Sequence, residues 1–503
     1  LTRTLPFRSN DALELIHAHI ARPPRAPHEM NALVPPALSA IVLKLMAKNA
    51  EDRYQSAWGI EADLRACIDA VQGGQTLSDF VPGRFDISDR FQIPKKLYGR
   101  EQEVDALLQA FERVVQGGPA ELLMVSGYAG IGKSALIYEV YKPVTQHRGY
   151  FAAGKFDQYQ RSVPYLAISQ VLRDLVEQVL TEDPDAILKW RETVRAAVSP
   201  NGKLLTDLVP ELDLLIGAQP DVPALGPSES ENRFQMVILN FIAAFCRPEH
   251  PLVLFLDDLQ WSNAASLRLR ETLLTSDLRY LFLIGAYRDN EVDATHPLSL
   301  SLQRLAKEGV RVTTVSLSPL SPGHITQLLT DTLRQPPEQV EPLTELLFAK
   351  TGGNPFFVGE FLKTLEQERL LSLSPERRWV WNIDAIHAKD ITDNVVDLLL
   401  GKLRKLPQAT QETLRLAACI GSRFDLSTLS VVHQRPLLPT AISLRPGLAE
   451  GFIVATSQPE LVSDARPDES GTHQIAALHY RFSHDRVQQV VYVLISEEQR
   501  RQV

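Results

Sequence analysis

The segment 127–134, with the sequence GYAGIGKS, restricts the possible folds more than any other part of the chain. A short apolar run, LLMVS at 122–126, precedes it, and a helical pattern, KSALIYEVY, begins at its end. The order of strand, glycine-rich loop and helix is typical of a loop that binds phosphate. The glycines allow consecutive N–H groups to point at one anion, and the N-terminus of the following helix adds positive potential. The alternative is a glycine-rich turn that binds no ligand.

Each residue type in this loop has a predicted part in holding a nucleotide. Gly127, Gly130 and Gly132 let the backbone curl around the phosphates. Lys133 would reach the β- and γ-phosphates, and the hydroxyl of Ser134 would bind Mg²⁺. The loop therefore predicts ATP or ADP, together with Mg²⁺, as the cofactors of this chain.

Four further apolar runs alternate with helical patterns after residue 97. Together with 122–126 they predict five buried strands, and helices between such strands indicate a parallel sheet that is covered on both faces. The runs are GYFAAGKF (149–156), LVLFLDD (252–258), YLFLIGAY (280–287) and VRVTTVSL (310–317). We therefore expect an α/β fold of the phosphate-loop NTPase type.

Two carboxylates, Asp257 and Asp258, end the apolar run at 252–258. Because parallel strands end at one edge of the sheet, we expect this pair to lie beside the glycine-rich loop. Asp257 would then hold Mg²⁺, directly or through water, and Asp258 would orient or deprotonate the water that attacks the nucleotide. The alternative for an acidic pair in this place is a helix cap.

Arg288 directly follows the apolar run at 280–287. If its strand lies beside that of Asp257, the cation is placed to contact the γ-phosphate and to stabilise negative charge in the transition state. The alternative is a structural ion pair with Asp289 or Glu291.

The patterns divide the chain into successive segments. Only helical patterns occur in 1–72, and the polar residues with Gly and Pro that follow read as a linker. The last segment has helical patterns and then two strand-like runs, GFIVAT and LHYRFSH, on either side of a polar loop at 457–474, which resembles a winged-helix hairpin. The predicted segments are 1–72 (helical), 73–96 (linker), 97–320 (α/β), 321–390 (helical) and 391–503 (winged-helix-like).

Composition narrows the classes of partner. The chain of 503 residues has 52 Lys and Arg against 61 Asp and Glu, a net charge of −9, so no basic field favours nucleic acid or anionic lipid. Its 3 cysteines are far apart, and no apolar run approaches the ~20 residues of a membrane helix. We expect a cytoplasmic protein without a membrane segment. Because it starts without Met and ends inside a helical pattern, we also expect a piece of a longer polypeptide.

Residues 97–503 resemble the STAND class of AAA-related P-loop ATPases. The resemblance rests on the strand order, on Tyr98-Gly-Arg-Glu101 and on GNPFF at 353–357, besides the loop and the acidic pair. It implies that Gly99 and Arg100 line an adenine pocket, that Pro355 closes over the adenine, and that His484 contacts the β-phosphate of ADP. Relatives often read DDLxWxD after the acidic strand, whereas this chain has Asn263 at the last position.

Residues 1–70 resemble the last helices of a serine/threonine protein kinase C-lobe, where Arg53 is similar to the arginine that pairs with the glutamate of the APE motif. The Gly-rich loop, the catalytic aspartate and the metal ligand of a kinase are missing. The resemblance thus implies kinase activity only for a longer parent. The order of segments resembles large bacterial proteins that join a serine/threonine kinase, this ATPase, a GAF sensor and a histidine kinase.

From these features we expect an ATP-binding regulatory switch that hydrolyses ATP slowly and controls attached kinase and sensor domains. A homo-oligomer that forms with nucleotide is compatible with this reading, and nucleic acid is not an expected partner. Two alternatives remain open at this point. One is a scaffold in which nucleotide is only structural, and the other is a transcription regulator that uses the winged helix.

Overall fold

The computed structural model describes residues 1–8, 15, 18–20, 22–73, 80–84, 86, 91–158, 163–374, 377–388, 395–456 and 478–495. The polar loop predicted at 457–474 lies outside these residues, as do parts of the linker at 73–96. Within the described residues, no helix combines the length and the apolar character needed to cross a membrane.

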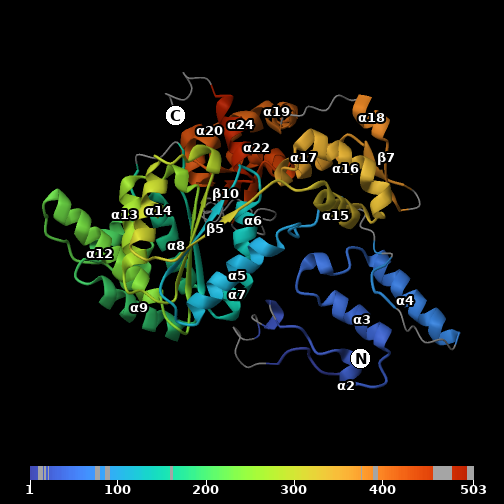
Figure 1. Ribbon diagram of the computed structural model, residues 1–503, viewed down its shortest axis with the longest axis horizontal. Coiled ribbons are helices and arrows are strands. Elements are labelled where there is room, and N and C mark those ends of the chain that lie inside the picture. The colour runs from blue at the N-terminus through green and yellow to red at the C-terminus, as the bar shows by residue number, and fades with distance from the viewer. Residues whose placement is uncertain are drawn as a thin grey trace.

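A parallel sheet of five strands forms the centre of the molecule, as predicted (Figure 1). The strand order is β2-β3-β4-β1-β5, so one strand, β4, separates the strand before the glycine-rich loop from the strand that carries the acidic pair. The strands are β1 (Glu121–Ser126), β2 (Tyr150–Lys155), β3 (Leu252–Asp257), β4 (Leu281–Tyr287) and β5 (Val312–Ser316).

The prediction of five buried strands is wrong for β5. Only Val315 of this strand is buried, and Thr314 and Ser316 are exposed. The reason is that β5 forms one edge, pairs with β1 alone and has little helix packed on it, whereas the other edge strand, β2, is buried because the helix at 166–180 packs along it.

Helices cover both faces of the sheet, because successive side chains of a strand point to opposite sides. Leu123 and Val125 pack against α5 (Glu101–Val115), α6 (Lys133–Ile137), η2 (Tyr138–Val140) and α7 (Tyr141–Gln146). Leu122 and Met124 belong to the opposite core. The helices of this core lie on the other side of the sheet (Figure 1). They are α8 (Leu166–Leu180), α9 (Pro184–Val198), α10 (Lys203–Leu208), α11 (Leu212–Ile216), α12 (Pro227–Phe245), α13 (Ala264–Thr275) and α14 (Pro297–Lys307), with η3 (Leu259–Trp261) and η4 (Asp289–Glu291) at the carboxyl ends of β3 and β4.

Two further units follow the sheet. The helical unit, residues 320–388, has its own core and contains α15 (Pro322–Leu333), α16 (Pro337–Thr351), α17 (Pro355–Gln367), β6 (Leu371–Leu373), β7 (Trp379–Trp381) and α18 (Ile383–Ala388). The C-terminal unit, residues 395–495, contains α19 (Val395–Lys405), α20 (Gln408–Ile420), β8 (Arg423–Asp425), α21 (Leu426–His433), α22 (Leu437–Ala449), β9 (Ile453–Ala455), β10 (His479–Phe482) and α24 (Asp485–Val493). The two strand-like runs predicted here are β9 and β10, which pair antiparallel, with β8 on the other side of β10.

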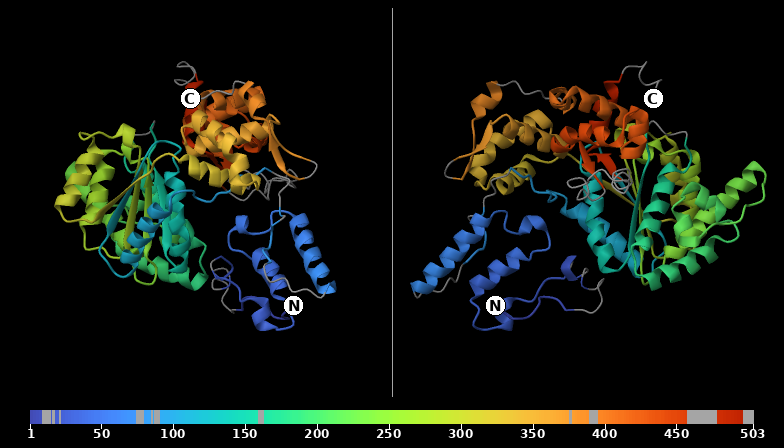
Figure 2. Two further views of the ribbon diagram at one scale, coloured as in Figure 1. Left: turned by 45° about the vertical axis from the view of Figure 1, so that its right-hand side comes forward. Right: turned by 180° about the vertical axis from the view of Figure 1, so that it is seen from behind.

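The described residues up to 72 contain helices and loops and no strand, in agreement with the helical patterns there. They form α2 (Pro27–Met30), α3 (Pro36–Leu45), η1 (Ala50–Asp52) and α4 (Ala57–Gln72). Figure 2 shows these helices on the side of the helical unit, away from α12 and α13.

Candidate functional site

The glycine-rich loop connects β1 to α6 and has the backbone conformation that its glycines predict. Gly127, Gly130 and Gly132 have φ angles of 143°, 82° and 101°, a region that side chains with a Cβ rarely adopt. A Cβ on Gly130 would also lie 2.9 Å from Oδ1 of Asn354 and 3.0 Å from Cβ of Phe356. Backbone conformation and the close approach of the helical unit therefore both favour glycine here.

Lys133 begins α6 and folds back over the loop. Its ammonium is buried and donates hydrogen bonds to the carbonyl oxygens of Gly127, at 2.8 Å, and Tyr128, at 3.0 Å. Burial lowers the pKa of Lys133, and the carboxylates of Asp257 and Asp258 partly oppose this shift. The loop thus holds a buried cation beside the acidic pair.

The acidic pair lies beside the loop, as predicted. β3 ends at Asp257, whose Oδ2 accepts a hydrogen bond of 3.3 Å from the hydroxyl of Ser134. A hydroxyl and a carboxylate are the oxygen ligands that Mg²⁺ prefers. Oδ2 of Asp258 is buried and lies 3.0 Å from the ammonium of Lys155, so it is paired with a cation, and Ser134 and Asp257 remain as the candidate metal ligands. These residues fit a magnesium ion.

Asp258 is more constrained than the sequence indicates. Its backbone is left-handed, with φ of 54°, and its side chain is buried. Gln260 donates from Nε2 to Oδ1 of Asp258 at 2.9 Å, and Oε1 of Gln260 accepts from the backbone N–H of Arg288 at 3.2 Å. Burial raises the pKa of Asp258, the cation of Lys155 opposes this, and the nearby carboxylate of Asp257 adds to it, so that the pKa is about 6.

Arg288 follows β4, on the strand next to β3, and is buried. Its guanidinium lies 3.4 Å from Asp258, 3.1 Å from Glu291 and 3.5 Å from Asp485. It also stacks over the ring of Trp261, 4.6 Å from the centroid. The structural ion pair with Glu291 is therefore present, and the contact of Arg288 with the γ-phosphate stays a prediction.

His484 precedes α24 and reaches the loop region from the C-terminal unit. Its ring stacks on Phe356, with centroids 3.9 Å apart, and its Nδ1 accepts from the backbone N–H of Arg486 at 3.1 Å. Burial lowers the pKa of His484 to about 4, so the ring is neutral at neutral pH. Phe356 in turn donates its backbone N–H to the carbonyl of Gly130 at 3.2 Å.

The residues expected around an adenine lie at the junction with the helical unit. Gly99 has φ of 61°, and a Cβ there would fall 2.1 Å from the ring of His324. The guanidinium of Arg100 is buried and donates to the carbonyl of Ser318. Pro355 is the first residue of α17.

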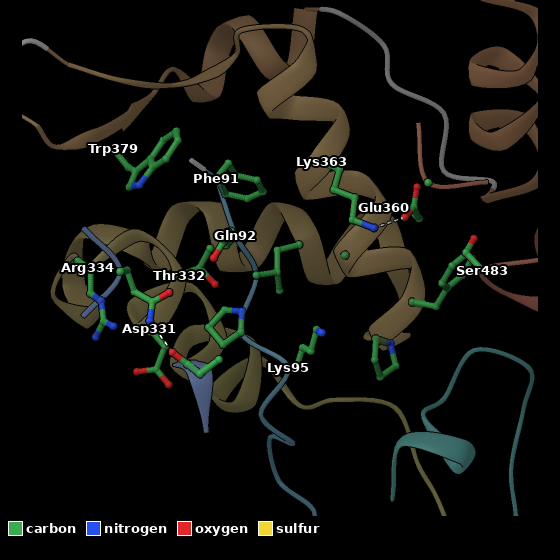
Figure 3. Close-up of a pocket in the computed structure, with 18 of the residues that line it drawn as sticks. Phe91, Gln92, Lys95, Asp331, Thr332, Arg334, Glu360, Lys363, Trp379 and Ser483 are labelled. Atoms are coloured by element: carbon green, nitrogen blue, oxygen red, sulfur yellow. Dashed lines mark hydrogen bonds and ion pairs between the residues drawn. The ribbon is translucent and has the colours of Figure 1, made fainter. Parts of the chain in front are cut away.

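Two cavities lie beside the stacked rings of Phe356 and His484, and only the smaller is lined by a residue of the loop, Ser134. The larger, of about 760 Å³, lies between the segment 91–95 and the helical unit, and Figure 3 shows Lys95 and Ser483 around it. Pro355 and Phe356 also line this cavity. The smaller, of about 290 Å³, is lined by residues of the sheet edge and the C-terminal unit, including Ser134, Lys155, Asp257, Ser483, His484 and Asp485. Since the stacked rings of Phe356 and His484 each line one cavity, they lie between the two.

Sequence reasoning missed three side chains that contact the predicted site. Lys155 forms an ion pair with Asp258, and Asp485 forms one with Arg288. Gln260 donates a hydrogen bond to Asp258. The position of Lys155 at the end of β2 was a usable signal, because β2 ends at the same edge as β3. Asn263, where relatives often carry aspartate, is a helix cap, and its Oδ1 accepts from the backbone N–H of Ser266 at 2.9 Å.

Comparison with known families agrees with this geometry. Residues 96–284 match the model of the AAA ATPase domain family. These residues are therefore similar to the AAA ATPase domain family.

Several curated proteins are similar to the chain. It is 29% identical to hybrid signal transduction histidine kinase G of Dictyostelium discoideum, over 99% of this chain and 17% of that protein. It is 22% identical to the peroxide stress-activated histidine kinase mak3 of Schizosaccharomyces pombe, over 86% of this chain and 22% of that protein. A stretch of 75 residues is 39% identical to the serine/threonine-protein kinase PknB of Mycolicibacterium smegmatis, covering 15% of this chain and 11% of the kinase. The chain thus spans less than a quarter of the length of each of these proteins.

Solved structures resemble the chain at low identity. A STAND protein with a tetratricopeptide repeat sensor from Pyrococcus horikoshii is 14% identical and aligns with 82% of this chain and 44% of that one, with a TM-score of 0.37. The ORC1 protein of Aeropyrum pernix, solved in complex with DNA, is 12% identical and aligns with 80% of this chain and 94% of that one, with a TM-score of 0.34.

Proposed function

We propose that residues 97–495 form a switch that binds Mg·ATP at the carboxyl edge of the sheet and hydrolyses it slowly. The observation that carries this proposal is the hydrogen bond of 3.3 Å between Ser134 and Asp257, which joins the glycine-rich loop to the acidic strand. In a P-loop ATPase these two elements must meet, because one binds the phosphates and both hold the metal. The match of 96–284 to the AAA ATPase domain family supports the same reading.

Each residue of the site then has a part in the reaction. The N–H groups of the loop and the ammonium of Lys133 hold the phosphates, and Ser134 and Asp257 hold the metal. Magnesium, when bound, supplies positive charge that neutralises the phosphate oxygens. Asp258 orients the attacking water and takes its proton, and its raised pKa is suited to accepting a proton near neutral pH. Arg288 stabilises the charge that develops on the phosphate, after exchanging one of its present carboxylate partners.

The two smaller units make the ATPase a switch. Asn354 donates to the carbonyl of Ala129 at 3.0 Å, and Phe356 bonds to Gly130, so the helical unit is attached to the loop itself. The adenine site is proposed at Pro355, which lines the larger cavity, and at Gly99 and Arg100, which lie outside that lining and contact His324 and Ser318. For nucleotide to move the units, it must bind two arrangements with different affinity. A ~10⁴-fold difference would change their ratio from 1:99 to 99:1.

We infer that the switch belongs to a larger signalling kinase. The similar histidine kinases align with nearly the whole chain, and a match of 75 residues to a serine/threonine kinase is about the length of the segment 1–72. The three-stranded antiparallel sheet and helices of the C-terminal unit support a winged helix. In this reading the attached kinase and sensor domains are the partners, and protein kinase activity belongs to the parent.

Nucleotide binding to Lys133→Ala tests the proposal. Removing a charged donor to phosphate is expected to weaken binding of a fluorescent ATP analogue at least about tenfold. Lys142→Ala removes an exposed lysine of α7 and is the matched control, expected to bind as the wild type does. Equal affinities in all three proteins would overturn the proposal. Multiple-turnover release of phosphate by the wild-type chain separates a hydrolysing switch from a structural scaffold.

A further inference from the structure

The ammonium of Lys155, the last residue of β2, has an unusual set of partners. It lies 3.0 Å from Oδ2 of Asp258 and 3.8 Å from Oδ2 of Asp257, and it donates a hydrogen bond to Oδ1 of Asp485. Its side chain is 20% exposed. One cation is therefore shared between the acidic pair of the ATPase domain and a carboxylate of the C-terminal unit.

Asp485 has a second cation on its other oxygen. Arg288 lies 3.5 Å from Oδ2 of Asp485, and the same guanidinium reaches Asp258 at 3.4 Å. Two cations thus each bridge Asp258 and Asp485. The carboxylate that begins α24 is held at the site by the same groups that hold the predicted catalytic acid.

The charges of this cluster are present at neutral pH. Burial alone would raise the pKa of Asp485, but Lys155 and Arg288 hold it well below its usual range. Burial alone would lower the pKa of Lys155, but Asp485, Asp257 and Asp258 outweigh this effect and hold it well above its usual range. The contact is therefore between full charges, and its strength depends on any new charge placed beside it.

We propose that Lys155 and Asp485 form an electrostatic latch that fastens the C-terminal unit over the acidic pair, and that binding of Mg·ATP opens it. This inference rests on the proposed function, because it needs nucleotide and metal at the loop. In this proposal Lys155 responds to the nucleotide and metal at the site, and its contact with Asp485 passes the response to α24. This role is separate from those of the glycine-rich loop and the acidic pair.

The direction of the effect follows from the signs of the charges. A divalent cation held by Ser134 and Asp257 would neutralise the carboxylates that now attract Lys155, and would repel its ammonium. The γ-phosphate would attract Lys155 and repel Asp485. The first change weakens the attachment of Lys155 to the acidic pair, the second weakens its pairing with Asp485, and ADP lacks the second. The latch is therefore expected to distinguish ATP from ADP, unlike the stacked rings of Phe356 and His484, which carry no net charge at neutral pH.

Asp485→Asn is the first test, in the whole chain, because it removes the charge at nearly unchanged shape. We expect the variant to release a fluorescent ADP analogue at least tenfold faster than the wild type. We also expect faster hydrogen exchange in 478–495 without nucleotide, at a rate that Mg·ATP raises little further. Asp485→Glu keeps the charge and is expected to stay within about threefold of the wild type for ADP release, which shows that the charge matters and not the fold.

Lys402→Gln is the matched control. Its ammonium pairs with Glu360 at 2.9 Å, with both side chains largely buried, and this pair joins α19 of the C-terminal unit to α17 of the helical unit, away from the acidic pair. We expect this variant to keep the wild-type difference between Mg·ATP and ADP in hydrogen exchange. An equal loss of that difference in Lys402→Gln and Asp485→Asn would overturn the latch.

A double-mutant cycle completes the experiment. Lys155→Gln and Asp485→Asn both remove the contact between the two residues, besides their other contacts, so the ADP release rate of the double variant should stay well below the product of the two single effects. Multiplicative effects would mean that the two residues act independently and would sink the inference. If the wild type binds nucleotide and Asp485→Asn behaves like it throughout, only the latch fails. If the wild type binds no nucleotide, the proposed function fails as well.

Discussion

Phe356 and His484 stack face to face, with ring centroids 3.9 Å apart and an angle of 17° between the ring planes. Phe356 belongs to the helical unit and its backbone N–H bonds to Gly130 of the glycine-rich loop, whereas His484 belongs to the C-terminal unit. The glycine-rich loop, the helical unit and the C-terminal unit therefore meet at this pair of rings.

Phe356→Ala is expected to loosen the C-terminal unit. An aromatic pair contributes about 0.5–1.5 kcal/mol beyond the area that it buries, so hydrogen exchange in 478–495 should accelerate several-fold. The matched control is Phe348→Ala on α16, because Phe348 is 38% exposed and its loss should leave this exchange unchanged. Identical exchange in the two variants would contradict the coupling that we assign to the stack.

The same contact gives a prediction about pH. His484 has a pKa of about 4 when buried, below the ordinary value of 6.5, so the docked arrangement favours the neutral ring. A lowered histidine pKa contributes stability that is present above pH 6.5 and is lost as the pH falls through 4. Docking of the C-terminal unit should therefore weaken progressively between these values.

Nuclear magnetic resonance of labelled histidines measures this titration, with His484→Gln to assign the signal. The midpoint of His484 is expected near 4 in the wild type and closer to 6.5 in Phe356→Ala, where the ring regains water. A wild-type midpoint near 6.5 would show that His484 is not buried in the docked state.

The pKa of Asp258 predicts how the rate of ATP hydrolysis depends on pH. The residue must be ionised to accept a proton, and its pKa is about 6, so the rate of ATP hydrolysis should rise with pH and level off above that value. Asp258→Asn should retain nucleotide binding and lose hydrolysis by about 10²-fold or more. Gln260→Leu removes a donor to the ionised carboxylate and should move the midpoint of the pH profile upward. Phosphate release at a series of pH values checks all three statements, and a profile without a midpoint near 6 would remove Asp258 from this role.

Much of the ATPase domain could be predicted from local sequence. The loop at 127–134 needs glycines for its φ angles and a strand and a helix at its ends, and all of these are neighbours in the chain. The meeting of Ser134 with Asp257 then follows from the topology of a parallel sheet, whose strands all end at one edge. The position of Arg288 beside the acidic pair follows in the same way, because β4 lies next to β3.

The contacts between units could not be predicted in this way. The pairing of Lys155 with Asp485 depends on where α24 docks, and the sequence pattern of 478–495 does not indicate which surface this helix will contact. The edge position of β5 was missed for a similar reason, since the pattern of 310–317 shows that a strand forms but not where it pairs. Gln260 was missed because its bond to Asp258 depends on the left-handed turn at Asp258.

Variants of Asn263 test whether this side chain only caps a helix or also takes part in ATP hydrolysis. Its Oδ1 caps α13, and asparagine and aspartate are about equally good caps, so Asn263→Asp should leave the melting temperature almost unchanged. Asn263→Ala loses the cap and should lower the free energy of unfolding by about 1 kcal/mol. Neither variant should change the rate of ATP hydrolysis at saturating nucleotide more than about twofold. A large gain of hydrolysis in Asn263→Asp would show that the acid of the relatives has a catalytic part that this chain lacks.

Gly154 tests how closely β2, and with it Lys155, is fixed against the neighbouring helix. A Cβ on Gly154 would lie 2.0 Å from the backbone oxygen of Ala167, at the start of α8, and a backbone atom cannot move away as a side chain can. Gly154→Ala should therefore lower the free energy of unfolding by about 1–3 kcal/mol, the usual cost of overpacking. Gly401, inside α19, is the matched control, because a Cβ there would meet no described atom within 4 Å. Alanine is the better helix former by about 0.5–1 kcal/mol, so Gly401→Ala should raise the melting temperature slightly. Thermal unfolding of both variants measures the contrast, and a Gly154→Ala protein as stable as the wild type would mean that β2 and α8 are less closely packed than described.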